Sequence, residues 1–186
     1  MNKQVVLVAG QEEALRLVVT EACVDMLTAC GTPVGHIAAE RDVAPRDHDI
    51  AGMIGFTGPI HGSLIIAAPP ELFESTLRAS AIDGPPLSLP DLLDWAGELA
   101  NQTLGRIKRR FCERGVDFQT STPTAISAQQ IENGGGRQEA LVGLLLTVKE
   151  GLVSVSFDVA PPQDGDLFRD QAQPIPCALE GDLVLF

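Results

Sequence analysis

The chain has 186 residues, of which 45% are apolar and 20% are charged, and its formal net charge at pH 7 is −12. This length and composition are typical of a globular protein with one buried core, which excludes disorder as the main state. Because the negative charge would be repelled by phosphate backbones, we expect no nucleic acid among the partners.

A first amphipathic helix is predicted over residues 11–30. Glu12 and Glu13 open it, apolar residues recur along it at helical spacing, and Gly31 follows it as a stop signal. The apolar run before this helix, residues 5–9, is too short for a signal peptide. We therefore expect a cytoplasmic protein with reduced thiols.

The cysteines and histidines do not form a metal-binding pattern. The four cysteines lack C-x-x-C spacing, and the three histidines are scattered along the chain. A protein metal site needs several such ligands in one cluster. We expect the chain to bind no metal and no cofactor of its own.

A stretch without charged side chains, residues 50–70, follows a predicted strand near 36–41. Its length alone would be compatible with a membrane span. It is interrupted, however, by glycines and prolines that predict a turn over 57–62, between buried strands at 50–56 and 62–68. The sequence favours this β-hairpin, and we expect no membrane among the partners.

Two helices are predicted after the hairpin. The shorter one spans about residues 71–81. The longer one begins after Ser88, where Asp91 completes a capping arrangement, and runs to about Cys112 before Gly115 stops it.

The second half of the chain is richer in predicted strands. A Gly-Gly-Gly tip at 134–136 does not follow a strand in the way that a nucleotide-binding loop requires, so ATP binding is not expected. The extended segments are 118–126, 141–148 and 152–160, followed by a loop over 161–176 and a last strand over 182–186.

A helix followed by paired strands occurs twice, over residues 11–68 and 90–160. The two copies share a pattern but little sequence identity. This repeat predicts a single α+β domain over residues 1–186, with pseudo-two-fold organisation. Its sheet should be largely antiparallel, with the helices packed against it.

The candidate functional residues lie on one face of the long helix. At about 100° per residue, Asp94, Glu98, Asn101 and Gly105 project within about 60° of one another, opposite the apolar residues. A carboxylate and an amide are thus held toward solvent by a helix anchored in a core. Gly105, without a side chain, would let a partner's backbone come close, although helix packing is an alternative role for it.

This pattern resembles a known signature. Asp94-x3-Glu98-x2-Asn101, followed by Pro123, together with the stretch 97–108, is similar to the CheC/CheX/FliY family of bacterial chemotaxis phosphatases. The gap from Asn101 to Pro123 is one residue shorter than the family pattern. On the earlier helix, CheC-like members carry a second Glu and Asn, whereas here Val24 follows Glu21 at that spacing. The resemblance therefore implies one active centre, as in CheX.

The resemblance implies an enzyme that removes the phosphoryl group from the aspartate of a phosphorylated CheY-like response regulator. Glu98 would engage the regulator's active-site lysine, and Asn101 would fix the attacking water. Asp94 and Gly105 would belong to the partner-binding surface. Mg²⁺ would be held by the partner regulator.

The family likeness also implies a homodimer formed through sheet edges, with residues 182–186 as a candidate edge strand. Two other functions stay open at this point. One is a non-enzymatic adaptor or flagellar-switch component with the same fold. The other is a small-ligand-binding α+β domain, for which only the apolar content argues. The five basic residues from Arg106 to Arg114 are interpreted as complements of a helix dipole.

Overall fold

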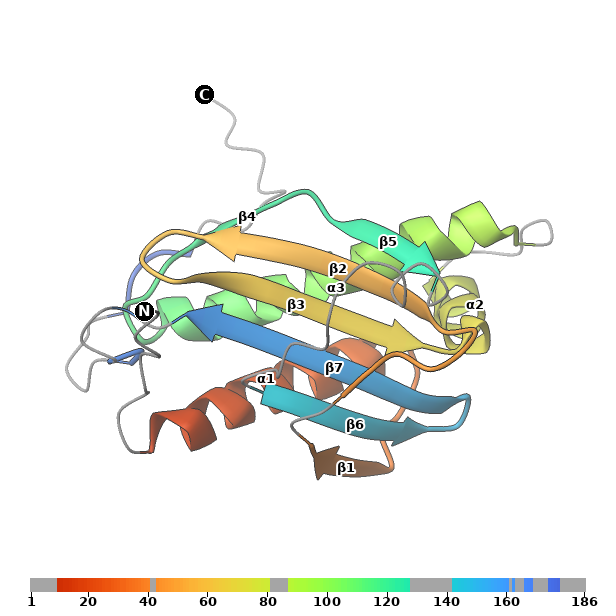
Figure 1. Cartoon of the computed structure of the whole chain (residues 1–186), viewed down its shortest axis with the longest axis horizontal. Coiled ribbons are helices and arrows are strands. Elements are labelled where there is room, and N and C mark those ends of the chain that lie inside the picture. The colour runs from red at the N-terminus through yellow and green to blue at the C-terminus, as the bar shows by residue number, and fades with distance from the viewer. Residues whose placement is uncertain are drawn as a thin grey trace, which may run out of the picture.

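The computed structural model describes residues 10–40, 43–80, 87–127, 142–160, 162, 166–168 and 174–177. These residues form three helices and a seven-stranded antiparallel sheet, as predicted for an α+β domain (Figure 1). The helices are α1 (Gln11–Ala29), α2 (Pro70–Ser80) and α3 (Leu89–Cys112). The strands are β1 (His36–Ala39), β2 (Ile50–Thr57), β3 (His61–Ala68), β4 (Gln119–Thr120), β5 (Thr124–Ser127), β6 (Val142–Val148) and β7 (Gly151–Ala160).

The order of the strands reveals how the two sequence repeats interlock. The sheet runs β1-β6-β7-β3-β2-β4, and β5 also pairs with β2. The last strands of the two repeats, β3 and β7, meet at the centre. The first strand of each repeat pairs in the other repeat's half, since β1 lies beside β6 while β4 and β5 lie beside β2. This arrangement confirms the predicted pseudo-two-fold organisation.

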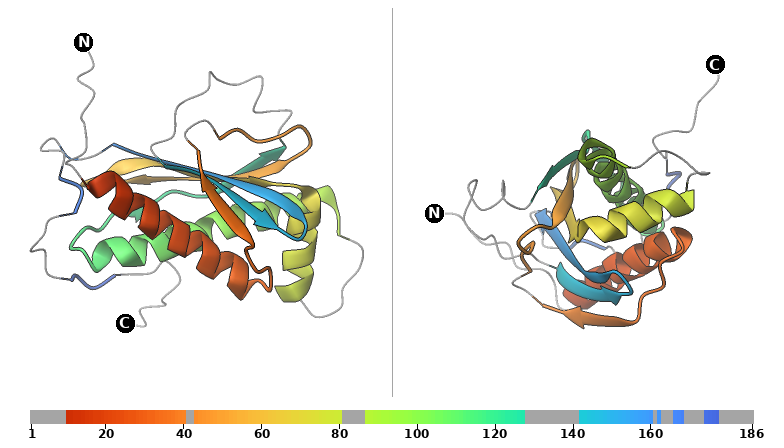
Figure 2. Two further views of the ribbon diagram at one scale, coloured as in Figure 1. Left: turned by 90° about the horizontal axis from the view of Figure 1, so that it is seen from below. Right: turned by 90° about the vertical axis from the view of Figure 1, so that its right-hand side faces the viewer.

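One face of the sheet is covered by α1 and α3 (Figure 2). Both helices bury an apolar stripe there because their apolar residues recur at helical spacing. Each fully buried aliphatic or aromatic side chain stabilises the fold by roughly 1.5–3 kcal/mol relative to exposure. The core includes Leu15, Val18 and Ala22 of α1, Leu99, Leu104 and Ile107 of α3, and Ile54, Leu64, Val155 and Phe157 of the sheet.

The uncharged stretch 50–70 forms the predicted hairpin of β2 and β3. Gly58, with a φ of 142°, makes the turn together with Pro59. No helix among the described residues is long and apolar enough to cross a membrane.

The predicted strand 118–126 is wrong in one respect, because it is divided into β4 and β5. Ser121 lies between β4 and β5 and makes two hydrogen bonds with Gly55 of β2. Its N–H donates to the Gly55 carbonyl at 2.9 Å, and its Oγ accepts from the Gly55 N–H at 3.0 Å. Pro123, two residues on, has no N–H to donate to a ladder. The edge segment therefore leaves regular pairing between Ser121 and Pro123.

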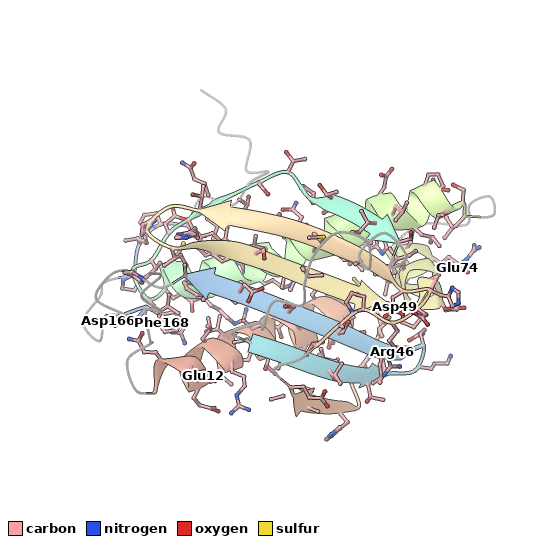
Figure 3. All side chains as sticks on the ribbon, viewed as in Figure 1. Glu12, Arg46, Asp49, Glu74, Asp166 and Phe168 are labelled. Atoms are coloured by element: carbon pink, nitrogen blue, oxygen red, sulfur yellow. The ribbon has the colours of Figure 1, made fainter. Side chains whose placement is uncertain are left out.

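A short segment after the sheet, residues 166–168, contacts both long helices. The Gln11 side chain at the start of α1 hydrogen-bonds Asp166 and accepts from the Leu167 N–H at 2.5 Å. Phe168 packs on Phe111 near the end of α3, with ring centroids 4.9 Å apart. Figure 3 shows Asp166 and Phe168 at the end of the sheet where α1 begins.

Several predicted features lie outside the described residues: the glycine tip at 134–136, most of the loop 161–176 and the last strand 182–186. The homodimer that would use that last strand stays a prediction.

Candidate functional site on α3

The start and the end of α3 are fixed by local interactions. The Ser88 N–H donates to Asp91 Oδ2 at 2.7 Å, which completes the predicted capping box. Hydrogen bonds from the Ser88 hydroxyl and N–H lower the pKa of the Asp91 carboxyl. At the other end, Gly115 adopts a φ of 75°, and the Val116 N–H donates back to the Phe111 carbonyl.

The first half of α3 lies unusually close to β2. A Cβ at Gly52 would stand only 2.1 Å from the Ala96 carbonyl oxygen, so the helix backbone touches the strand backbone at this point. On the neighbouring side, Pro123 lies 3.6 Å from the place where a Cβ of Gly97 would be. This contact gives Pro123 a packing role beneath the helix. Both contacts lie within about one turn of Glu98, so they fix the height of the candidate residues over the sheet.

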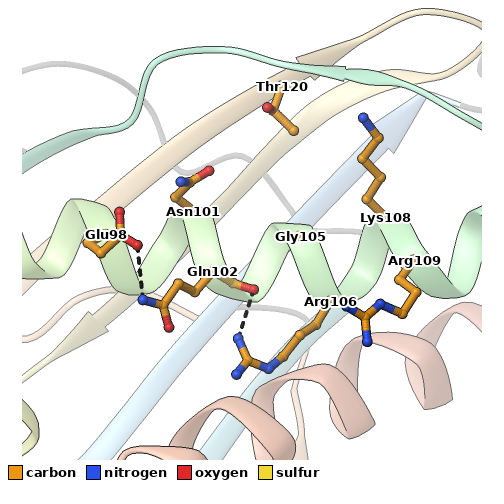
Figure 4. A pocket seen from close by; sticks show the side chains of 8 residues that line it. All are labelled: Glu98, Asn101, Gln102, Gly105, Arg106, Lys108, Arg109 and Thr120. Carbon is orange, nitrogen blue, oxygen red and sulfur yellow. Dashed lines mark hydrogen bonds between the residues drawn. The ribbon is translucent and has the colours of Figure 1, made fainter. Parts of the chain in front are cut away.

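The outward face of α3 borders a cleft of about 330 Å³ (Figure 4). The cleft is shared between the helix and strand β4. It is lined by Glu98, Asn101, Gln102, Gly105, Arg106, Lys108, Arg109 and Thr120.

Glu98, Asn101 and Gly105 thus come together as predicted from their spacing. Glu98 and Asn101 are half-buried, each reaching the cleft from the same side of the helix. A Cβ added at Gly105 would meet nothing within 4 Å outside the helix's own backbone, which supports an open face rather than helix packing. Asp94 is exposed one turn before Glu98, but it does not line the cleft.

Sequence reasoning missed a neighbour that orients the candidate carboxylate. Gln102 Nε2 donates to Glu98 Oε1 at 2.9 Å. The i, i+4 spacing of the two residues is a signal from which this bond could have been expected. The bond leaves the second carboxylate oxygen of Glu98 available for a group outside the chain.

The interpretation of the basic residues as dipole complements was incomplete. Lys108 is only 6% exposed, and its Nζ lies 3.4 Å from Asp117 Oδ1. Thr120 contributes a buried hydroxyl that has no hydrogen-bond partner among the described residues. Neither feature can be read from the sequence, because both depend on how β4 folds back along α3.

The described residues hold no group of three or more side chains that could bind a metal ion. The buried cysteines are also poorly suited to nucleophilic chemistry. Burial raises the pKa of Cys23 to about 12. Burial, followed by the neighbouring Cys177 thiol, raises that of Cys112 to about 12. Both groups are therefore thiols near neutral pH. The polar groups that line the cleft include two amides, a carboxylate and cations.

Comparisons with known proteins agree with this geometry. The family model for the chemotaxis phosphatase CheX matches residues 50–144, a range that contains all of α3. No curated protein sequence matches the chain.

Solved structures share the fold at low sequence identity. A chemotaxis protein CheX from Desulfovibrio desulfuricans is 20% identical, with a TM-score of 0.61 over 79% of this chain and 99% of its own. A CheC-like superfamily protein from a Shewanella species is 18% identical, with a TM-score of 0.61 over 78% and 97%. The CheX-CheY-BeF3-Mg²⁺ complex from Borrelia burgdorferi contains a chain that is 13% identical, with a TM-score of 0.60 over 77% and 96%.

Proposed function

The chain belongs to the CheX family of chemotaxis phosphatases, and from this premise we propose that it hydrolyses the aspartyl phosphate of a CheY-like response regulator. The observation that carries the proposal is the joint placement of Glu98 and Asn101 on one cleft, beside the open position at Gly105. In this proposal, α3 presents these groups to the regulator's phosphorylation site.

The reaction needs little covalent chemistry from this protein. An aspartyl phosphate is already an activated electrophile, and its hydrolysis requires a water molecule in line with the bond that breaks. Phosphoryl transfer is accelerated mainly by positioning and by charge stabilisation. The amide oxygen of Asn101 can accept a hydrogen bond from this water and hold the water in line with the bond that breaks. Because an amide does not titrate, the step does not depend on a general base at position 101.

Glu98 has a different role in this proposal. Its carboxylate would pair with a lysine of the regulator's active site and so set the register of docking. The Gln102 amide already holds one carboxylate oxygen at 2.9 Å, which reduces the conformational freedom that Glu98 would lose on binding. Mg²⁺ would remain with the regulator, as a component of the substrate rather than of this chain.

The proposal is tested with a CheY-like receiver from the same organism, phosphorylated by a small-molecule phosphodonor. The wild-type protein should release inorganic phosphate from it. Asn101→Ala should slow turnover by about 100-fold with little loss of receiver binding, because the amide acts mainly in the transition state. Val24→Ala, at the corresponding position of α1, is the matched control and should keep full turnover.

Two outcomes would contradict this mechanism. If the wild-type protein binds receivers but releases no phosphate from any of them, the adaptor function replaces the phosphatase function. The second outcome is that Asn101→Asp keeps the full rate and its turnover rate becomes dependent on pH. A base at this position would then be tolerated, and positioning by a neutral amide would not explain catalysis.

A further inference from the structure

The C-terminal part of α3 and the residues just after it carry five cations: Arg106, Lys108, Arg109, Arg110 and Arg114. Complementing the helix dipole accounts for cations in the last turn, where the effect is concentrated. Arg106 lies more than one turn before the end of α3 at Cys112. The dipole therefore does not explain the whole cluster.

Three of these cations are engaged within the protein. Lys108 forms its ion pair with Asp117. Arg110 contacts two carboxylates of α1, with Nε 3.3 Å from Glu21 Oε2 and Nη2 2.6 Å from Asp25 Oδ2. Their charges and hydrogen bonds outweigh the effect of burial and raise the pKa of the Arg110 guanidinium.

Arg114 is engaged in another way. Its Cζ lies 5.4 Å from the centroid of the Phe168 ring, and its Nη1 donates to the Arg110 carbonyl at 2.8 Å. This cation thus completes the contact between the end of α3 and the segment after the sheet.

Arg106 and Arg109 differ from these three. Both line the cleft that Asn101 also borders, and neither pairs with an acidic side chain of the described part of the chain. Arg106 donates to the Gln102 carbonyl at 3.1 Å, and Arg109 is exposed. The sequence has 25 acidic and 13 basic residues, so a shortage of carboxylates does not explain why these two arginines are unpaired. Of the five cations at this end of α3, Arg106 and Arg109 are thus the two without an acidic partner among the described residues.

We propose that Arg106 and Arg109 recognise the acidic surface of the phosphorylated receiver next to its phosphoryl group. This inference rests on the proposed function, since the substrate named there is itself an anion. Guanidinium groups suit carboxylate and phosphoryl oxygens because their N–H donors form planar pairs. A protein with a net charge of −12 repels an anionic partner at long range, and a local cationic rim offsets this repulsion where the partner must land.

The order of the charges along α3 also determines the direction of docking. Asp94 and Glu98 precede Asn101 along the helix, whereas Arg106 and Arg109 follow it, with Gly105 between the two groups. A partner with a cation on one side of its reacting centre and anions on the other can lie along this helix in one direction only. Reversal would oppose like charges at both ends.

The test is a comparison of Arg106→Gln, Arg109→Gln and the double variant with wild type. Exposed charge pairs act mainly on association. We expect about a 5-fold rise in Kd for each single variant and about 20-fold for the double variant. The binding probe is the receiver carrying beryllofluoride and Mg²⁺ as a stable mimic of the phosphoryl group. In the turnover assay, KM should rise in the same proportion, while kcat stays within about 2-fold.

Ionic strength provides a second measurement. Salt should weaken receiver binding less in the double variant than in wild type, because the double variant lacks the two arginine charges that salt would screen. Lys149→Gln, on the exposed turn between β6 and β7, is the control with the same loss of charge away from the cleft, and it should leave Kd unchanged. Thermal unfolding of Arg109→Gln should match wild type, because its exposed side chain forms no internal pair within the described residues.

The inference is overturned if the double variant binds the receiver with the wild-type Kd and salt dependence. It is also overturned if kcat falls while Kd stays constant. These results differ from a failure of the proposed function, in which wild type releases no phosphate. A wild-type protein that binds the receiver without turnover still reports on the arginines through Kd.

Discussion

Helices α1 and α3 hold corresponding places in the two repeats, but the candidate functional residues lie on α3. On α3, Glu98 and Asn101 border the cleft. At the same spacing on α1, Glu21 pairs with Arg110 and Val24 packs against the core. At these positions of α1, the Glu21 carboxylate is engaged with α3, and Val24 offers no polar group to a partner. In the proposed function, the two helices therefore have different roles within one repeated scaffold.

The two helices also differ in how they meet the sheet. The Ala96 carbonyl of α3 contacts the backbone of β2 at Gly52. Helix α1 packs instead over β6, where the side chains of Leu144 and Leu146 are buried. Contact between backbones leaves less room for adjustment than contact between side chains. The helix with the candidate site is thus the more rigidly placed of the two. That is what a mechanism based on positioning requires.

The largest effect is expected when this contact is broken by Gly52→Ala. The added methyl group would stand 2.1 Å from the Ala96 oxygen, and neither backbone can move away without shifting α3. We expect a loss of about 3 kcal/mol in the free energy of unfolding, measured with urea. Turnover should fall as well, because Glu98 and Asn101 rise with the helix. Wild-type stability and turnover in this variant would show that α3 is not held by β2.

Much of this comparison could be anticipated from the sequence. The helical spacing of Leu99, Leu104 and Ile107 sets the buried side of α3, and hence places Glu98 and Asn101 on the other side. The turn at Gly58 follows from short-range chemistry. Such features depend on residues close together in the chain, for which periodicity and turn signals are direct evidence.

What could not be predicted depends on contacts between distant segments. The helical spacing already placed Gly105 on the outward face of α3, but nothing in the local sequence shows that Gly52 receives a helix backbone. The burial of Lys108 and the pairing of Arg110 with α1 likewise arise only after β4 and α1 come beside α3. The division of the strand at Ser121 is set by its bonds to Gly55, 66 residues earlier.

Gly105→Ala makes the same chemical change as Gly52→Ala, but we expect it to change the free energy of unfolding in the opposite direction. A methyl group at position 105 meets nothing within 4 Å outside the helix's own backbone, and Ala favours helix by about 1 kcal/mol over Gly. The free energy of unfolding should therefore rise by up to about 1 kcal/mol. Gly105→Leu should also fold, but its bulk beside Asn101 should weaken receiver binding. Unchanged binding of the Leu variant would remove position 105 from the docking surface.

The smallest effect is expected for Glu21→Gln, which tests the division of roles between the helices. Glu21 is half-exposed, and Arg110 retains its bond to Asp25 at 2.6 Å when Glu21 is neutralised. The free energy of unfolding should fall by roughly 0.5 kcal/mol or less, with no change in turnover. Glu98→Gln on α3 removes the same charge, but it should act on receiver binding and turnover and leave stability close to wild type. Urea unfolding and phosphate release, measured on both variants, separate these outcomes. If Glu21→Gln reduced turnover as much as Glu98→Gln, α1 would be part of the functional surface, and the protein would not have a single centre on α3.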